Sequence, residues 1–325
     1  MSATPPAVEV SRRSALRLGA CSLLALAAAA ACGGAPATPA NAPPRSSSPQ
    51  DRDLRLVTNA ISEEERLGGF CAEAARRFPD QRRTLTALAA RQRLHVARLR
   101  STLSDLNPPV DHISPPVPRR AAALEITLGA LVKEARTARF QDAQRASSGL
   151  LAELFASIAA SHAQTDYLVT PQSAVITVTV PDTVDSAEQL QSALAAEHAA
   201  VYGYSLLGGV LSAAVSDDPL ARTALASYNA HRARRDDLTG LIALAGGQPV
   251  ASAAAYDIPF PVSGATSARR LARYLESRCA AVYARAVAVT SGTDRVFVSD
   301  CLLGCAVRGV RWGAAPSAFP GLETR

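Results

Sequence analysis

Two proline-rich stretches, Ile113-Ser-Pro-Pro-Val117 and Ile258-Pro-Phe-Pro-Val262, decide the fold that this sequence of 325 residues predicts. Each is followed by a helical pattern with a Leu-Glu pair, Leu124-Glu125 after the first and Leu275-Glu276 after the second. A rigid proline-rich crossing suits a long connection between the second and third helices of a four-helix bundle, because proline cannot continue a helix. The repetition predicts two such bundles in tandem, and hence an all-α fold.

The hydrophobic periodicity of both halves supports this prediction. Apolar residues recur at spacings of three and four, which is typical of amphipathic helices. Four helices are predicted within residues 51–170 and four within residues 186–325. Residues 171–185 contain an alternating β-branched run that cannot form a sheet alone, so we expect an extended connector there.

The N-terminus, residues 1–31, has the features of an export signal. Arg12 and Arg13 precede an apolar run that is too short for a comfortable membrane span, and paired arginines are typical of the twin-arginine route. Small residues before Cys32 resemble a bacterial lipobox, which predicts a lipoprotein at the outer face of the cytoplasmic membrane. Ordinary cleavage at the same point would instead give a secreted protein. Residues 32–50, rich in Pro, Ala and Ser, are expected to be a disordered linker.

Composition excludes several function classes. The formal net charge is +6, from 34 basic and 28 acidic residues, and aromatic residues make up only 5% of the chain. This balance is too mild to predict nucleic-acid binding. Because the sequence also has no nucleophile-elbow or phosphate-loop motif, it favours no enzymatic class. We therefore expect the partners to be a membrane, through a lipid anchor, and a protein or small molecule that the sequence does not identify.

Six short motifs in the second half form a combination that is more specific than any one of them. They are Ala196-Glu197-His198, Tyr202-Gly-Tyr204, His231-x-x-Arg234-Arg-Asp236, Tyr256-x-Ile-Pro-Phe-Pro-Val262, Leu275-Glu276 and Phe319-Pro-Gly-Leu322. Together they resemble a ferritin-like domain family of unknown function, found in secreted bacterial proteins with twin-arginine or lipoprotein signals. The first half resembles the ferritin-like region that often precedes this domain. The resemblance implies two tandem ferritin-like four-helix bundles, and no established activity.

Acidic and histidine residues on the helical stripes are candidate metal ligands, because carboxylates and imidazoles inside a ferritin-like bundle suit iron or manganese. The candidates are Glu64, His95, Glu125 and His162 in the first half and Glu197, His231 and Glu276 in the second half. Ferritin-like di-metal sites use a Glu-x-x-His motif on two of the four helices. Neither His95 nor His231 is preceded by a Glu at that spacing. The last predicted helix has no histidine and instead carries Arg308 and Arg311, which we expect to oppose a divalent cation and to pair with a carboxylate.

Two interpretations of these residues follow. In the first interpretation, each buried Glu and His is paired with another side chain across its bundle, because a buried carboxylate must be paired or neutral. Alternatively, the residues hold one or two ions, and the chain is an iron- or manganese-binding redox protein of the di-iron carboxylate type. The incomplete ligand sets favour the first interpretation: a structural or binding protein with a degenerate metal site and no resident cofactor.

The cysteines of the second half predict a disulfide. The last two predicted helices, at about residues 266–290 and 293–313, are joined by a short connection around Gly292, which forces an antiparallel hairpin. Cys279 lies 13 residues before Gly292 and Cys305 lies 13 residues after it, so these two thiols are expected to face each other and to pair. Cys301 lies about one turn out of level and is expected to stay free. The alternative is that all three are small buried apolar side chains.

Overall fold

The computed structural model describes residues 48–103, 113–170, 176–185, 187–212 and 219–322. The signal and Cys32 lie outside these residues, and so do His112 and most of the linker. The described residues contain eight α-helices and no strand, which confirms the all-α prediction. The helices are α1 (Pro49–Arg77), α2 (Arg82–Arg100), α3 (Ala121–Arg145), α4 (Gly149–Val169), α5 (Ala187–Ser212), α6 (Pro219–Leu244), α7 (Ala265–Val289) and α8 (Gly292–Arg311).

The start of α1 illustrates how local sequence sets a helix boundary. Ser48 Oγ accepts a hydrogen bond from the Asp51 backbone N–H at 3.0 Å, and the Asp51 carboxylate accepts one from the Ser48 N–H at 3.1 Å. Pro49 takes the first helical position, where a missing N–H costs nothing. The helix therefore begins two residues inside the segment that the sequence assigned to the linker.

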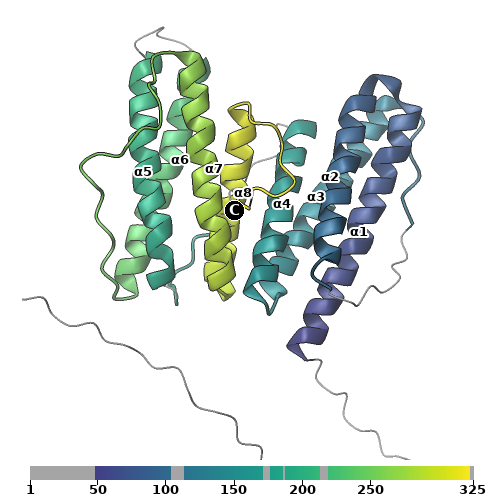
Figure 1. Cartoon of the computed structure of the whole chain (residues 1–325), viewed down its shortest axis with the longest axis horizontal. Helices are drawn as coiled ribbons and strands as arrows, with labels where there is room; N and C mark the ends of the chain where they lie inside the picture. The colour runs from purple at the N-terminus through teal and green to yellow at the C-terminus, as the bar shows by residue number, and fades with distance from the viewer. Residues whose placement is uncertain (1–47, 104–112, 171–175, 186, 213–218, 323–325) are drawn as a thin grey trace, which may run out of the picture. The chain divides into compact units, whose positions relative to one another are not determined.

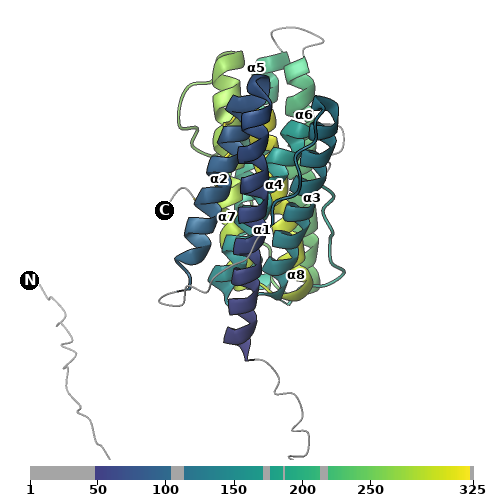
Figure 2. The same cartoon turned by 90° about the vertical axis from the view of Figure 1, so that its right-hand side faces the viewer.

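The helices pack in pairs, as Figure 1 shows: α1 against α2, α3 against α4, α5 against α6, and α7 against α8. In addition, α5 lies along α7, and α4 packs on both α7 and α8. The view in Figure 2 shows the helices running roughly parallel to one common direction. Because α4 contacts helices of both halves, it joins α1–α3 to α5–α8.

One apolar core runs through both halves. It includes Phe155 of α4, Tyr283 of α7 and Phe297 of α8, all fully buried, together with residues from each of the other helices. Every residue of α4 from Leu151 to Asp166 is buried, which is typical of a helix surrounded by others rather than of a surface helix. The two halves are therefore packed together over an extended apolar interface.

A C-terminal segment, residues 314–322, follows α8 and returns to α4, where it is seen as the yellow loop beside α4 in Figure 1. The hydroxyls of Ser157 and Ser161 on α4 donate to the carbonyls of Pro320 and Ser317, at 2.9 and 2.7 Å. The Ser317 N–H donates to Gln164 of α4 at 2.9 Å. These bonds hold the end of the second half against the first half.

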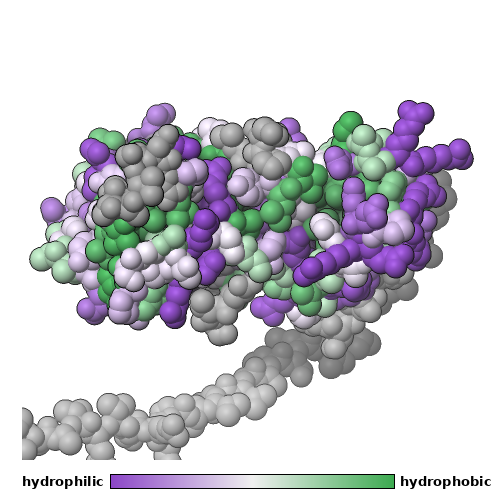
Figure 3. Space-filling model, turned by 90° about the horizontal axis from the view of Figure 1, so that it is seen from above, coloured by the Kyte–Doolittle hydropathy of each residue, from purple (hydrophilic) through white to green (hydrophobic). Residues whose placement is uncertain are grey.

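Hydrophilic and hydrophobic residues share the surface. The face in Figure 3 has purple and green residues side by side, and the exposed large apolar residues, such as Ile126 on α3 and Leu225 on α6, come from different helices. None of the described helices combines the length and the apolar character needed to cross a membrane.

Candidate functional site

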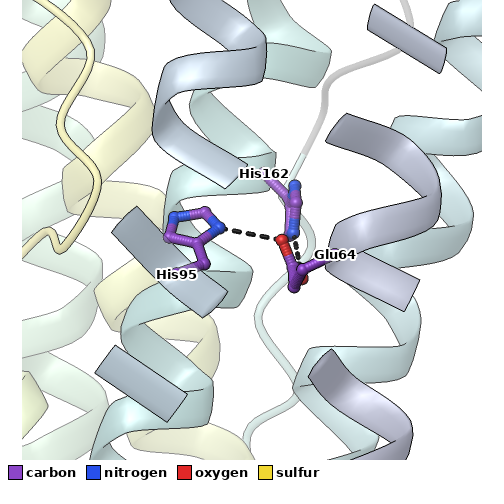
Figure 4. A group of neighbouring side chains, drawn as sticks. All are labelled: Glu64, His95 and His162. Atoms are coloured by element: carbon purple, nitrogen blue, oxygen red, sulfur yellow. Dashed lines mark hydrogen bonds and ion pairs between the residues drawn. The ribbon is translucent and has the colours of Figure 1, made fainter. Parts of the chain in front are cut away.

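A first buried cluster joins three helices of the N-terminal half (Figure 4). Glu64 of α1 lies between His95 of α2 and His162 of α4, and all three side chains are buried. His95 Nδ1 lies 2.9 Å from Glu64 Oε2, and His162 Nε2 lies 2.9 Å from Glu64 Oε1. The three residues occupy the apolar stripes on which the sequence placed them, because each stripe faces the inside of the bundle.

The C-terminal segment completes this cluster. His95 Nε2 lies 2.9 Å from the carbonyl oxygen of Ala318, and the Phe319 ring packs edge-on against the imidazole, with centroids 5.5 Å apart. Since Ala318 offers only an acceptor, Nε2 carries a proton. Nδ1 faces two further acceptors, Glu64 and the Gln92 side-chain oxygen, which lies 3.1 Å away.

Charge stabilises the ionised form of Glu64. Burial alone would raise the pKa of Glu64, but the charges and hydrogen bonds of His162 and His95 outweigh burial and hold it well below its usual range. Burial lowers the pKa of His162, although Glu64 opposes this shift. Arg139 of α3 adds a positive charge, with Nη1 3.9 Å from Glu64 Oε1 and Nη2 bonded to Glu63 at 2.7 Å.

The fourth candidate of the first half is not in the cluster. Glu125 is exposed on α3, and the helix contributes Arg139 instead. Glu125 follows the fully buried Leu124, and neighbouring helical residues point about 100° apart, so it faces away from the apolar stripe. It also lies 14 residues before Arg139, about 21 Å along the helix. The prediction that Glu125 is a ligand is therefore wrong.

A second buried cluster occupies the C-terminal half and contains all three candidates predicted there. His231 of α6 lies between two carboxylates, with Nδ1 2.7 Å from Glu197 Oε2 of α5 and Nε2 3.1 Å from Glu276 Oε1 of α7. All three are buried. Because both ring nitrogens face carboxylates, the imidazole meets both acceptors only when it is doubly protonated.

Three further side chains close the second cluster. The Tyr283 hydroxyl donates to Glu197 Oε1 at 2.6 Å, and the Tyr204 hydroxyl donates to Glu276 Oε1 at 2.7 Å. Arg308 Nε donates to the same Glu276 oxygen at 2.9 Å. The prediction that an arginine of the last helix pairs with a carboxylate is confirmed at Arg308. Glu276 Oε2 is buried without a hydrogen-bond partner among the described residues.

The ionisation of the second cluster follows from these contacts. Burial would lower the pKa of His231, but the charges of Glu197 and Glu276 raise it to about 10. Burial would raise the pKa of Glu276, but Arg308 and His231 lower it to about 2. Two carboxylates therefore face one imidazolium and one guanidinium, and the cluster is balanced in charge.

The two clusters differ in how well they fit a metal ion. In the second cluster the charges are already balanced and Arg308 adds a cation, so a divalent ion would meet repulsion without an unpaired charge to bind. The Glu197, His231 and Cys279 donor atoms do lie within 4.8 Å of one another. However, the Cys279 thiol is a poor ligand here, because the neighbouring Cys305 side chain and burial raise its pKa well above the usual range.

The first cluster fits an ion better. Glu64, His95 and His162 place a carboxylate oxygen and two imidazole nitrogens within 4.8 Å of one another, and two histidines with one carboxylate form a ligand set that suits Fe(II). Ligating histidines usually donate their second N–H to a carbonyl or carboxylate, as His95 does to Ala318. Against this fit stands the positive charge of Arg139.

The four described cysteines, Cys71, Cys279, Cys301 and Cys305, are free, buried thiols. The expected Cys279–Cys305 disulfide is therefore not formed in this structure. The two thiols are nonetheless neighbours, since the Cys305 side chain lies close enough to raise the pKa of Cys279. The short connection at the start of α8 does bring this pair together.

Sequence reasoning missed some members of both clusters. The sequence analysis does not identify Arg139 and Gln92 as partners of the first cluster, or Tyr204 and Tyr283 as partners of the second. A sequence signal for Arg139 does exist: it lies four residues after Ala135 and four before Ala143, on the buried stripe of α3. A charged residue on such a stripe indicates a buried ion pair.

Comparison with known proteins gives a family but no activity. No curated protein is significantly similar to the chain. One solved structure, a conserved hypothetical protein from Mycobacterium tuberculosis, is 35% identical over 40% of this chain and 92% of that one, with a TM-score of 0.35. Residues 189–324, which contain the second cluster and the C-terminal segment, match the family described as a Domain of unknown function (DUF4439).

Proposed function

We propose that this chain is an exported, lipid-anchored ferritin-like protein with a structural and ligand-binding role, in which a charge network stands where a bundle of this type would hold metal. The observation that carries the proposal is the position of His231, hydrogen-bonded on both ring nitrogens by Glu197 and Glu276. Arg308 supplies the second positive charge, at 2.9 Å from Glu276. A network whose buried charges are balanced by its own side chains holds the helices together without an ion.

Elemental analysis of the purified mature protein tests this proposal. We expect less than one iron or manganese per chain, and no change in metal content for His231→Gln. Two ions per chain that are lost on Glu197→Gln or His231→Gln would overturn the proposed role and establish the di-iron type of protein instead.

The anchor is proposed from Cys32 and the linker that follows it. A lipid on Cys32 would hold the helical domain, through the residues between Cys32 and α1, at the outer face of the cytoplasmic membrane. Cys32→Ala should move the protein from the membrane fraction to the medium, whereas Cys21→Ala, inside the signal, should leave it in the membrane fraction. A wild-type protein that is already in the medium would contradict the anchor and leave simple secretion.

A second candidate function is metal binding at the first cluster alone. It is favoured by one observation: the bond from His95 Nε2 to Ala318 leaves Nδ1 to face Glu64 and His162. In this case Glu64, His95 and His162 would hold one iron or manganese ion, which would supply redox chemistry. One ion per chain, lost on His162→Gln and retained in His231→Gln, would establish this function.

A further inference from the structure

A cavity of about 360 Å³ lies between α6 and α8, next to the second cluster. It is lined by Ser227 and Arg234 from α6, by Arg308 and Arg311 from α8, and by Ile176 of the connector, among others. Unlike the pairs α5–α6, α5–α7 and α7–α8, helices α6 and α8 do not pack closely along their length. The space between them is therefore an opening in the bundle rather than part of its core.

The charge of this cavity has one sign. Three arginines and no acidic side chain are among the described residues that line it. Arg234 uses Nη1 to bond Asp237 at 2.8 Å, and Arg308 uses Nε and Nη2 to bond Glu276 and Cys305. A guanidinium has five N–H donors, so each of these arginines keeps donors for a ligand.

The backbone of α8 makes room for the arginines. A Cβ atom at Gly304 would lie 3.2 Å from Arg308 Nη1, so the missing side chain lets the guanidinium lie along the helix at the cavity wall. Arg311 is exposed at the end of α8, and its guanidinium lies 5.5 Å from the ring centroid of Tyr167 on α4, a cation–π contact that orients it.

The remaining wall of the cavity is apolar. Ile176 and Val178 of the connector and Val307 of α8 line it beside the arginines. A volume of about 360 Å³ is at the small end of ligand pockets. It suits a small molecule with one anionic group and a short apolar part, and it is too small for a two-chain lipid.

We propose that the cavity between α6 and α8 binds a small amphipathic anion, whose carboxylate or phosphate contacts Arg234, Arg308 and Arg311 and whose apolar part packs on Ile176, Val178 and Val307. Arginine suits this task because its planar donors match carboxylate and phosphate oxygens. The inference rests on the proposed ligand-binding role and names the class of ligand.

Trp312 provides a direct readout. It is the only tryptophan of the chain, it is fully buried, and its Nε1 donates to Ser227 Oγ in the cavity wall at 3.1 Å. Its fluorescence can be followed while the mature protein is titrated with octyl phosphate, octanoate, octylammonium, octan-1-ol and inorganic phosphate, with calorimetry as a second measurement. We expect saturable binding of the two octyl anions, and much weaker binding of the cation, the alcohol and inorganic phosphate.

Variants test the arginines. Arg234→Gln and Arg311→Gln should each weaken binding of octyl phosphate about tenfold or more, since each removes a charge-assisted contact. Arg232→Gln is the matched control, because Arg232 is exposed and lies on the opposite side of α6 from Ala230 and Arg234. Circular dichroism checks that each variant is folded.

Several outcomes would overturn the proposal: no saturable binding by either method, equal binding of octylammonium, inorganic phosphate binding as tightly as octyl phosphate, or wild-type affinity in both variants. Failure here is distinct from failure of the proposed function. A protein with two ions per chain that still binds octyl phosphate would refute the charge network and keep the cavity. A metal-free protein that binds none of the probes would keep the charge network and refute the ligand site in the cavity.

Discussion

At the residue scale, His231 is the side chain on which the second cluster depends. It connects Glu197 to Glu276, and its removal leaves two carboxylates buried with only Arg308 as a cation. Breaking a buried ion pair from one side usually costs about 3 to 5 kcal/mol. We therefore expect His231→Gln to lower the free energy of unfolding by this amount, as measured by urea denaturation.

A matched control is available on the neighbouring helix. His198 of α5 is only partly buried and bonds the Val250 carbonyl at 3.1 Å. His198→Gln should cost less than about 1 kcal/mol, as expected for a residue outside a buried network. Equal costs for the two substitutions would show that the His231 network does not stabilise the fold.

The same residue predicts a pH dependence. The pKa of His231 is raised from 6.5 to about 10 by the two carboxylates, despite burial. A raised pKa means that the stabilisation is complete below the unfolded value and disappears as the pH rises through the folded value. The free energy of unfolding should therefore fall between about pH 6.5 and pH 10, and the fall should be smaller in His231→Gln. A wild-type stability that is flat over this window would contradict the charged state of His231.

At the scale of the elements, the hairpin of α7 and α8 brings Cys279 and Cys305 together as neighbouring free thiols. Outside the cytoplasm such a pair can oxidise. A bridge would close a loop of about 26 residues and add roughly 3 kcal/mol by the chain-entropy argument. We expect a non-reducing peptide map of the exported protein to contain a Cys279–Cys305 peptide, and Cys279→Ala to lose the increment in stability.

Cys301 provides the control for this prediction. It is buried on the same helix as Cys305, but one turn closer to the connection. The Cys301→Ala protein should still give the cross-linked Cys279–Cys305 peptide, and oxidation should still raise its free energy of unfolding. Free Cys279 and Cys305 thiols in the exported protein would contradict the predicted bridge. A bridge through Cys301 would instead contradict the predicted register of α7 against α8.

At the scale of the whole molecule, the C-terminal segment links the family domain to the first cluster, and Gly321 is the position that allows it. Its φ is +85°, and a Cβ there would lie 2.7 Å from the Ala280 carbonyl oxygen and 2.8 Å from the Ala284 Cβ of α7. Gly321→Ala should therefore loosen the segment over Ala318 and His95. We expect faster hydrogen exchange in residues 314–322 and a loss of more than about 1 kcal/mol.

Gly313 separates the effect of conformation from that of contact. It has the same φ of +85°, but the nearest atom to an added Cβ is Arg273 Nη1 at 3.8 Å. Gly313→Ala should show the conformational cost alone, and hence a smaller change in exchange than Gly321→Ala. Equal effects would mean that the close approach to α7 contributes nothing to holding the segment.

The helices could be predicted from local sequence, because hydrophobic periodicity, proline and capping residues act within a few residues of one another. It therefore also placed Glu64, His95, His162, Glu197 and His231 on stripes that face inward. The exposure of Glu125 follows from the same local geometry. The prediction of Glu125 as a ligand instead followed the similarity between the pairs Leu124-Glu125 and Leu275-Glu276.

The way in which the two halves are joined depends on contacts between residues far apart in the chain. Nothing local relates His95 to Ala318, which lies 223 residues away in the chain, or indicates that α4 is covered on all sides by helices of both halves. Alanine-rich faces such as that of α4 fit many neighbours, so their partners depend on the summed packing of the whole molecule rather than on any one residue. The charge state of His231 also depends on tertiary packing, because the imidazole on α6 meets one carboxylate from α5 and one from α7.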